Sequence, residues 1–186
     1  MQTAEQFSLY DQLAALPENL TGEILNGQIH AQPRPAPRHA RAASRLDRSI
    51  GRGYDDGDDG PGGWWILPEP EIHFVRKLEV VVPDLAGWKH ERMPKLPETD
   101  YFETVPDWVC EVLSPSTASK DREVKMPIYA HYGVRHAWLV DPKARTLEAL
   151  ELRSGVWAEI GRFSGSDAVS IVPFDKIRIE LATLWT

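Results

Sequence analysis

The chain has 186 residues, 42% of them hydrophobic, which suits one well-packed core, so we predict a single domain over residues 1–186. Its formal net charge of −7 at pH 7 excludes a protein that coats nucleic acid through bulk electrostatics, because neutralising phosphates requires clustered Lys and Arg. The sequence has neither an apolar run of about 18 residues nor a basic leader followed by an apolar stretch, so we expect a cytoplasmic protein without a membrane partner.

The first part of the chain predicts a helix and then a hairpin. Apolar residues recur at helical spacing over residues 3–16. Residues 21–30 predict a hairpin around Asn26-Gly27, a pair that readily takes the positive φ angles of a two-residue turn. Glu23 lies on its first strand, where a solvent-facing position is the simplest interpretation, since Glu is rarely fully buried.

A second helix is predicted over residues 38–54, after a Pro-rich link. One face of it collects Arg38, Arg41, Arg45, Arg48 and Arg52. His39 lies on the separate apolar side. This face has two interpretations: a basic ridge that meets phosphates, or a solvated face balanced by the acids of residues 55–59. The candidate nucleic-acid-binding residues are Arg38, Arg41 and Arg45 of this face, together with His39.

Three short strands are predicted next, at residues 64–67, 71–75 and 78–84, followed by a polar loop over residues 87–105. The third strand ends in Pro83-Asp84, which places a carboxylate where a core strand leaves the sheet, a common position for a functional site. Since Pro-Asp is also a good turn pair, Asp84 as a simple turn former is the alternative.

The stretch over residues 107–132 predicts a buried strand, a turn and a helix that carry charges inward. In the strand over residues 108–113, Glu111 shares a face with Val109 and Leu113, while Cys110, the only cysteine, lies on the other face as a core residue. On the helix, Lys125 falls inside the apolar stripe. A structural ion pair or a Lys whose charged end reaches solvent is the simpler interpretation.

The remaining elements complete a mixed α and β pattern. Pro127 is expected to kink or restart the central helix, because it removes a backbone hydrogen bond. Further strands are predicted at residues 135–141, 146–152, 156–163 and 177–181, the middle two as a hairpin.

Asp84, Glu111 and Lys125 form two acids and one base that could converge at the end of a sheet. Two carboxylates can hold Mg²⁺ or Mn²⁺, hard cations that prefer oxygen ligands. Such a metal lowers the pKa of a bound water, while an ammonium stabilises the transition state, which is the chemistry of phosphodiester hydrolysis. Spacing alone does not distinguish this site from a structural ion-pair network.

The segments around these residues resemble one family. They are Val-Val-Pro-Asp84-Leu, Pro-Asp-Trp-Val-Cys-Glu111-Val-Leu-Ser-Pro-Ser-Thr, and Asp121-Arg-Glu-Val-Lys125 with Tyr129. The pattern is similar to the Uma-two-type "putative restriction endonuclease" family of the PD-(D/E)xK nuclease superfamily, across roughly the whole chain.

The resemblance implies an α/β (α+β) fold, a restriction-endonuclease-like mixed β-sheet flanked by helices with a C-terminal β-hairpin. It also implies that Asp84 and Glu111 bind the metal. The superfamily pattern places a Lys two residues after the Glu, where this chain has Leu113; in the family the Lys is taken to have moved to the helix, here Lys125. Glu23 resembles an additional acid, as a metal ligand or an orienting residue, and His39 resembles a pocket residue.

We therefore predict a homodimeric endonuclease dependent on Mg²⁺ or Mn²⁺, acting on nucleic acid and on DNA in the first instance, with Asp84, Glu111, Lys125 and Glu23 as catalytic residues. One alternative is a non-catalytic module that binds nucleic acid or another partner on a nuclease scaffold. A third hypothesis is a structural homo-oligomer whose interface is formed by exposed members of the seven tryptophans.

Overall fold

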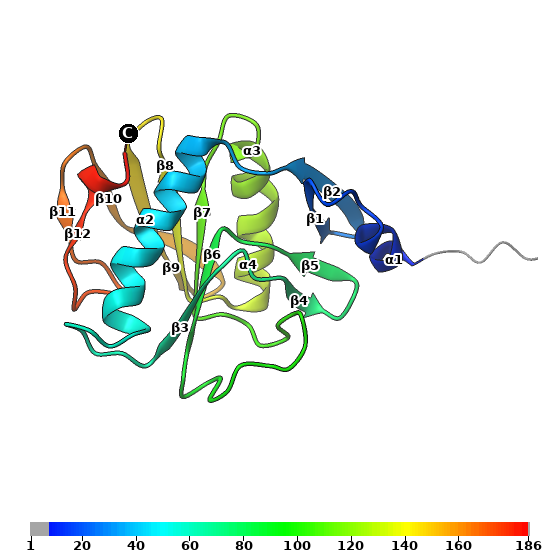
Figure 1. Cartoon of the computed structure of the whole chain (residues 1–186), viewed down its shortest axis with the longest axis horizontal. Helices are drawn as coiled ribbons and strands as arrows, with labels where there is room; N and C mark the ends of the chain where they lie inside the picture. The colour runs from blue at the N-terminus through cyan, green and yellow to red at the C-terminus, as the bar shows by residue number, and fades with distance from the viewer. Residues whose placement is uncertain (1–7, 186) are drawn as a thin grey trace, which may run out of the picture.

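The structure, a computed structural model, describes residues 8–185 and contains one large mixed sheet with helices on both faces (Figure 1). The helical elements are α1 (Leu9–Ala14), α2 (Pro37–Tyr54), α3 (Ala118–Lys120), the π-helical turn η1 (Asp121–Lys125), α4 (Met126–Tyr132) and the short 3₁₀ turn η2 (Leu181–Thr183). The strands are β1 (Leu20–Leu25), β2 (Gln28–Pro33), β3 (Trp64–Pro68), β4 (Ile72–Val75), β5 (Glu79–Val81), β6 (Leu85–Lys89), β7 (Trp108–Val112), β8 (His136–Asp141), β9 (Thr146–Arg153), β10 (Val156–Ser164), β11 (Ala168–Val169) and β12 (Ile179–Glu180).

The large sheet has the strand order β10-β9-β8-β7-β6-β3. β7 and β8 are parallel and joined through α3, η1 and α4, while the other neighbours are antiparallel. The predicted hairpin of β9 and β10 lengthens this sheet. A mixed sheet flanked by helices confirms the predicted fold class.

Strand β7 divides the core into two layers, as its alternation predicts. Its residues Trp108 and Cys110 pack into the cluster that contains Leu46 of α2, and the chain after β10 closes over the same cluster. Val109 packs on the opposite side with Ile128 of α4. Glu111 therefore projects toward the helix that carries Lys125, as the strand period requires.

A second sheet, with strand order β2-β1-β5-β4, packs beside the large one and carries α1 (Figure 1). The predicted turn of its β1–β2 hairpin is confirmed, with φ of 51° at Asn26 and 74° at Gly27. Within the described residues, the expected first helix is α1, which Ser8 caps and which runs over Leu9–Ala14; the part of that prediction over residues 3–7 lies outside the described chain.

The loop predicted over residues 87–105 is wrong at its start, because β6 continues through Lys89. Gly87 lies at a tightly packed position of this strand, where a Cβ would meet the side chains of Ile66, Trp64 and Trp108 at 3.0–3.3 Å. The late strand predicted over residues 177–181 shortens to β12, paired with β11.

Pro127 acts on the central helix as predicted. Its missing N–H cannot bond the carbonyl four residues earlier, and the preceding residues form the π turn η1 before α4 begins at Met126. Because η1 spans Asp121 to Lys125, this irregular turn carries both side chains into the protein.

The hypothesis of exposed tryptophans is wrong. Trp64, Trp88, Trp108 and Trp138 are buried, and no tryptophan within residues 8–185 belongs to the exposed large hydrophobics. The homodimer itself stays a prediction. In the same range, no helix combines the length and the apolarity needed to cross a membrane.

Candidate active site

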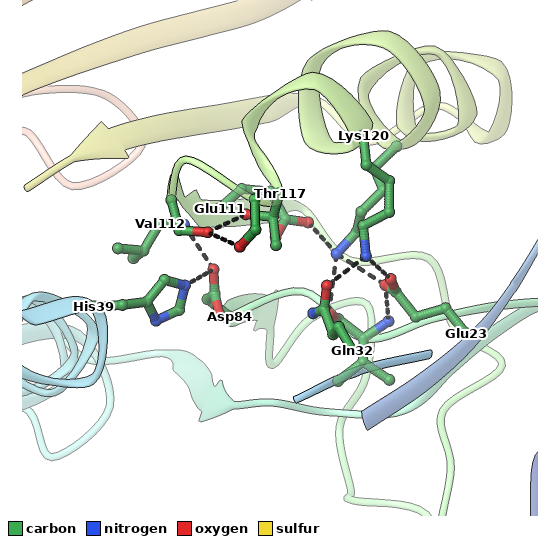
Figure 2. Close-up of polar contacts among 12 residues, drawn as sticks. Glu23, Gln32, His39, Asp84, Glu111, Val112, Thr117 and Lys120 are labelled. Carbon is green, nitrogen blue, oxygen red and sulfur yellow. Dashed lines mark hydrogen bonds and ion pairs between the residues drawn. The ribbon is translucent and has the colours of Figure 1, made fainter. Parts of the chain in front are cut away.

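Asp84 lies immediately before β6, at the point where the two sheets meet (Figure 2). The backbone N–H of Val112, at the end of β7, donates to Asp84 Oδ2 at 2.6 Å, and His39 Nε2 of α2 lies 3.2 Å from the same oxygen. These contacts hold the carboxylate against the last residue of the central strand, so Asp84 does more than form a turn.

Glu111 is 2% exposed and is held by two donors from the helix behind it. Tyr129 Oη donates to Glu111 Oε1 at 2.5 Å, and Lys125 Nζ lies 2.8 Å from the same oxygen. Tyr129 and Lys125 are four residues apart on the continuous η1–α4 helix, which places both side chains over β7.

Lys125 is 1% exposed and three oxygen atoms hold its ammonium group, so the interpretation of a charged end that reaches solvent is wrong. Nζ lies 2.9 Å from Glu23 Oε1 and 2.8 Å from Glu111 Oε1, and it donates to the carbonyl oxygen of Val82 at 3.0 Å. Burial opposes the charged form, but the two carboxylates prevail and raise the pKa of Lys125 well above its ordinary value.

Glu23 is fully buried, so its interpretation as a solvent-facing strand residue is also wrong. It accepts from the backbone N–H of Val82 at 3.0 Å and from Lys120 Nζ at 2.7 Å, and Lys120 also donates to Gln32 at 2.7 Å (Figure 2). Burial acts to raise the pKa of Glu23, yet Lys125 and Lys120 hold it below its ordinary value. Glu23 thus orients ammonium groups, which favours a positioning role over metal binding.

An open cavity of about 310 Å³ lies between these elements. Its wall includes the side chains of Asp84, Glu111, Asp121, His39 and Lys125. The structure therefore brings together Asp84, Glu111, Lys125 and His39, while Glu23 lies behind Lys125 and outside the cavity wall.

Sequence reasoning missed three residues of this site. Asp121 and Tyr129 shared the inward helical stripe with Lys125, so their position was visible but no role was assigned. Lys120 lay outside that stripe, and nothing in the pattern pointed to its contact with Glu23, which is 97 positions away.

The electrostatics of the cavity disfavour the ionised form of Glu111. Burial raises the pKa of Glu111 to about 8, against the effect of Lys125, and the nearby Asp121 and Asp84 act in the same direction as burial. A divalent cation would favour the ionised form that burial disfavours.

The donors also fit a hydrated Mg²⁺ or Mn²⁺. One oxygen of each acid, Oδ2 of Asp84 and Oε1 of Glu111, is held by the protein donors, so Oδ1 and Oε2 would be the ligands. Over the part of the chain that the structure describes, no group of three or more His, Cys, Asp or Glu has the arrangement to hold a metal by itself. Mg²⁺ suits such a site, because it commonly binds one or two carboxylates and keeps several waters.

The arginine face of α2 is largely free of acidic partners. Arg52 pairs with Asp59 at 2.8 Å, but no ion pair within residues 8–185 involves Arg38, Arg41 or Arg48. The interpretation of an arginine face balanced by the acids of residues 55–59 therefore holds only for Arg52, near the C-terminal end of α2.

Comparisons with known proteins agree with this geometry. A family described as "Putative restriction endonuclease", Uma2, matches residues 7–182. Over 109 residues the chain is 32% identical to "Uncharacterized protein slr1290" of Synechocystis sp., a match that covers 59% of this chain and 54%, about half, of that protein. A crystal structure of "a putative nuclease belonging to DUF820" from Anabaena variabilis has a TM-score of 0.75 at 20% identity, covering 96% of this chain and 97% of that one, and so shares the fold.

Proposed function

Because the chain belongs to the Uma2 family, described as "Putative restriction endonuclease", we propose that it is a metal-dependent endonuclease that hydrolyses phosphodiester bonds of nucleic acid, DNA in the first instance. The observation that carries this proposal is the convergence of Asp84, Glu111 and Lys125, from three separate elements, on one cavity. A structural ion-pair network alone does not require carboxylates on an open cavity wall.

Each side chain has a distinct role in the proposed reaction. Asp84 and Glu111 would hold Mg²⁺ or Mn²⁺, which when bound supplies an activated water and neutralises charge on a phosphoryl oxygen. The ammonium of Lys125 would stabilise the negative charge that develops on the phosphoryl group, and Glu23 keeps it in position without reorganisation. His39 orients Asp84 through Oδ2.

Titration calorimetry with Mn²⁺ tests the metal site first. We expect the wild type to bind Mn²⁺ and the double variant Asp84→Asn/Glu111→Gln to lose binding, because both proposed ligands are replaced by amides of similar shape. Wild-type cleavage of single-stranded and duplex DNA and RNA should occur with Mn²⁺ and stop with EDTA. Mn²⁺ binding that survives in the double variant would remove these acids from the site.

The second candidate is a non-catalytic module that binds nucleic acid, which the unpaired arginines of α2 favour. These arginines would serve either function, because they would contact the phosphate backbone rather than the scissile bond. Salt-sensitive DNA binding by a protein that neither binds Mn²⁺ nor cleaves would support the module and contradict the endonuclease.

Replacing Arg38 and Arg41 by Gln is expected to weaken nucleic-acid binding without affecting Mn²⁺ affinity. Both residues are exposed, and they flank His39 of the cavity wall. The slope of log affinity against log salt concentration should fall by roughly 1.4–1.8 for two lost phosphate contacts. Fluorescence anisotropy in EDTA would measure this slope for the wild type and the variant.

The control for the arginine variant is Arg153→Gln/Arg178→Gln, which removes the same charge. These arginines already pair with Glu151 and Glu180 on the surface. An equal slope change in both variants would show that net charge alone, and not the α2 face, controls binding.

A further inference from the structure

Asp121 is a buried acid of the cavity that the proposed reaction leaves without a role. It begins the π turn η1, is 3% exposed and lines the cavity beside Asp84 and Glu111. Its carboxylate accepts a hydrogen bond from the Thr117 side chain. No ion pair within residues 8–185 involves Asp121, in contrast to Glu23.

The cavity and its surroundings gather more acids than ammonium groups. The acids are Asp84, Glu111, Asp121 and Glu23, and the ammonium groups are those of Lys120 and Lys125. Both ammonium groups pair with Glu23, and that of Lys125 also pairs with Glu111. A buried carboxylate without a cationic partner is heavily penalised, so a divalent cation in the cavity would stabilise the ionised form of the acids that lack an ammonium partner.

The local backbone directs Asp121 to the cavity. The π turn before Pro127 runs from Asp121 to Lys125, so the irregular segment of this helix is the one that carries two cavity side chains.

We propose that Asp121 is the third acid of the cation site and that it holds the waters of the bound cation rather than the cation itself. This inference rests on the proposed metal site at Asp84 and Glu111. The described residues provide no three-acid group arranged to hold a metal directly, and Mg²⁺ retains several of its waters in proteins. Asp121 is therefore a positioning residue that acts through those waters.

Asp121→Asn tests the proposal because it keeps the size of the side chain and removes its charge. Mn²⁺ affinity, measured by calorimetry, should fall by about 10–100-fold, the usual effect of losing a group that orients a metal's ligands. The melting temperature without metal should stay the same or rise, because a buried carboxyl group without an ion-pair partner has been replaced by a neutral amide. A purely structural acid would give the opposite pair of results, a lower melting temperature and unchanged Mn²⁺ affinity, and would overturn the proposal.

The matched control is Glu123→Gln, the same change of charge at an exposed position two residues along the same turn, and it should change neither quantity. If Asp121→Asn does not fold, Thr117→Val releases the carboxylate from its hydrogen bond and should lower Mn²⁺ affinity; unchanged affinity would overturn the proposal. If the wild type binds no Mn²⁺, the proposed function fails. If the Asp84→Asn/Glu111→Gln variant loses Mn²⁺ binding and Asp121→Asn keeps it, the inference about Asp121 fails and the proposed function stands.

Discussion

Lys125→Met is expected to lower metal-dependent cleavage by about 10²–10³-fold, the range found when one preorganised electrostatic donor is lost from an active site. Lys125 lines the cavity, and Glu23, Glu111 and the Val82 carbonyl hold its ammonium group at 2.8–3.0 Å. Methionine retains much of the buried stem and removes only the charge and its hydrogen bonds. Mn²⁺ should still bind, because both proposed metal ligands remain.

Single-turnover cleavage at saturating Mn²⁺ would measure the loss of cleavage rate, and calorimetry would measure Mn²⁺ affinity separately. The matched control is Lys120→Met, which removes an ammonium from the same cluster but not from the cavity wall. A wild-type rate in Lys125→Met would leave Lys125 as a structural ion-pair partner. A loss of Mn²⁺ affinity as large as the loss of rate would mean that Lys125 acts by orienting Glu111 and not on the phosphoryl group.

Glu23→Ala is expected to reduce the free energy of unfolding by about 3–5 kcal/mol, the usual cost of removing one partner from a buried ion pair. Glu23 is fully buried and contacts both Lys125 and Lys120, so its removal leaves two cations short of a partner. It also leaves the N–H of Val82 without its acceptor. Urea unfolding of the metal-free protein would measure the change.

Two further variants show whether the loss of unfolding free energy in Glu23→Ala comes from the charge of Glu23. Glu180→Ala, which breaks the exposed pair with Arg178, should stay within about 0.5 kcal/mol of wild type. The double variant Glu23→Gln/Lys125→Met should lose less than the sum of its single changes, because each then removes the other's unpaired charge. Strict additivity would show that Glu23 and Lys125 are not coupled.

Periodicity explains why much of the fold was predictable. The period of two in β7 assigned Glu111 to the helix side, and helical spacing placed Lys125 inward. Local backbone chemistry placed the Asn26-Gly27 turn and the break at Pro127. In each case the signal comes from residues close together in the chain, which need no tertiary contact to be interpreted.

The errors arose where tertiary packing overrode local preference. The loop predicted over residues 87–105 starts too early, because Leu85–Lys89 pair with β3 and β7 as strand β6. Glu23 was expected at the surface because of its type, yet two lysines from a distant helix pair with it in the interior.

By itself, the sequence determined that Glu111 and Lys125 point inward and which elements carry them, because the periods of strand and helix set the direction of these side chains. Only the tertiary structure decided which charges meet. Glu23 and Lys120 are 97 positions apart, and their contact depends on how the small sheet docks against the helix between β7 and β8. For the same reason Glu23 lies behind Lys125 while Asp121 lines the cavity: long-range packing, and not the neighbouring sequence, decides which groups surround each buried acid.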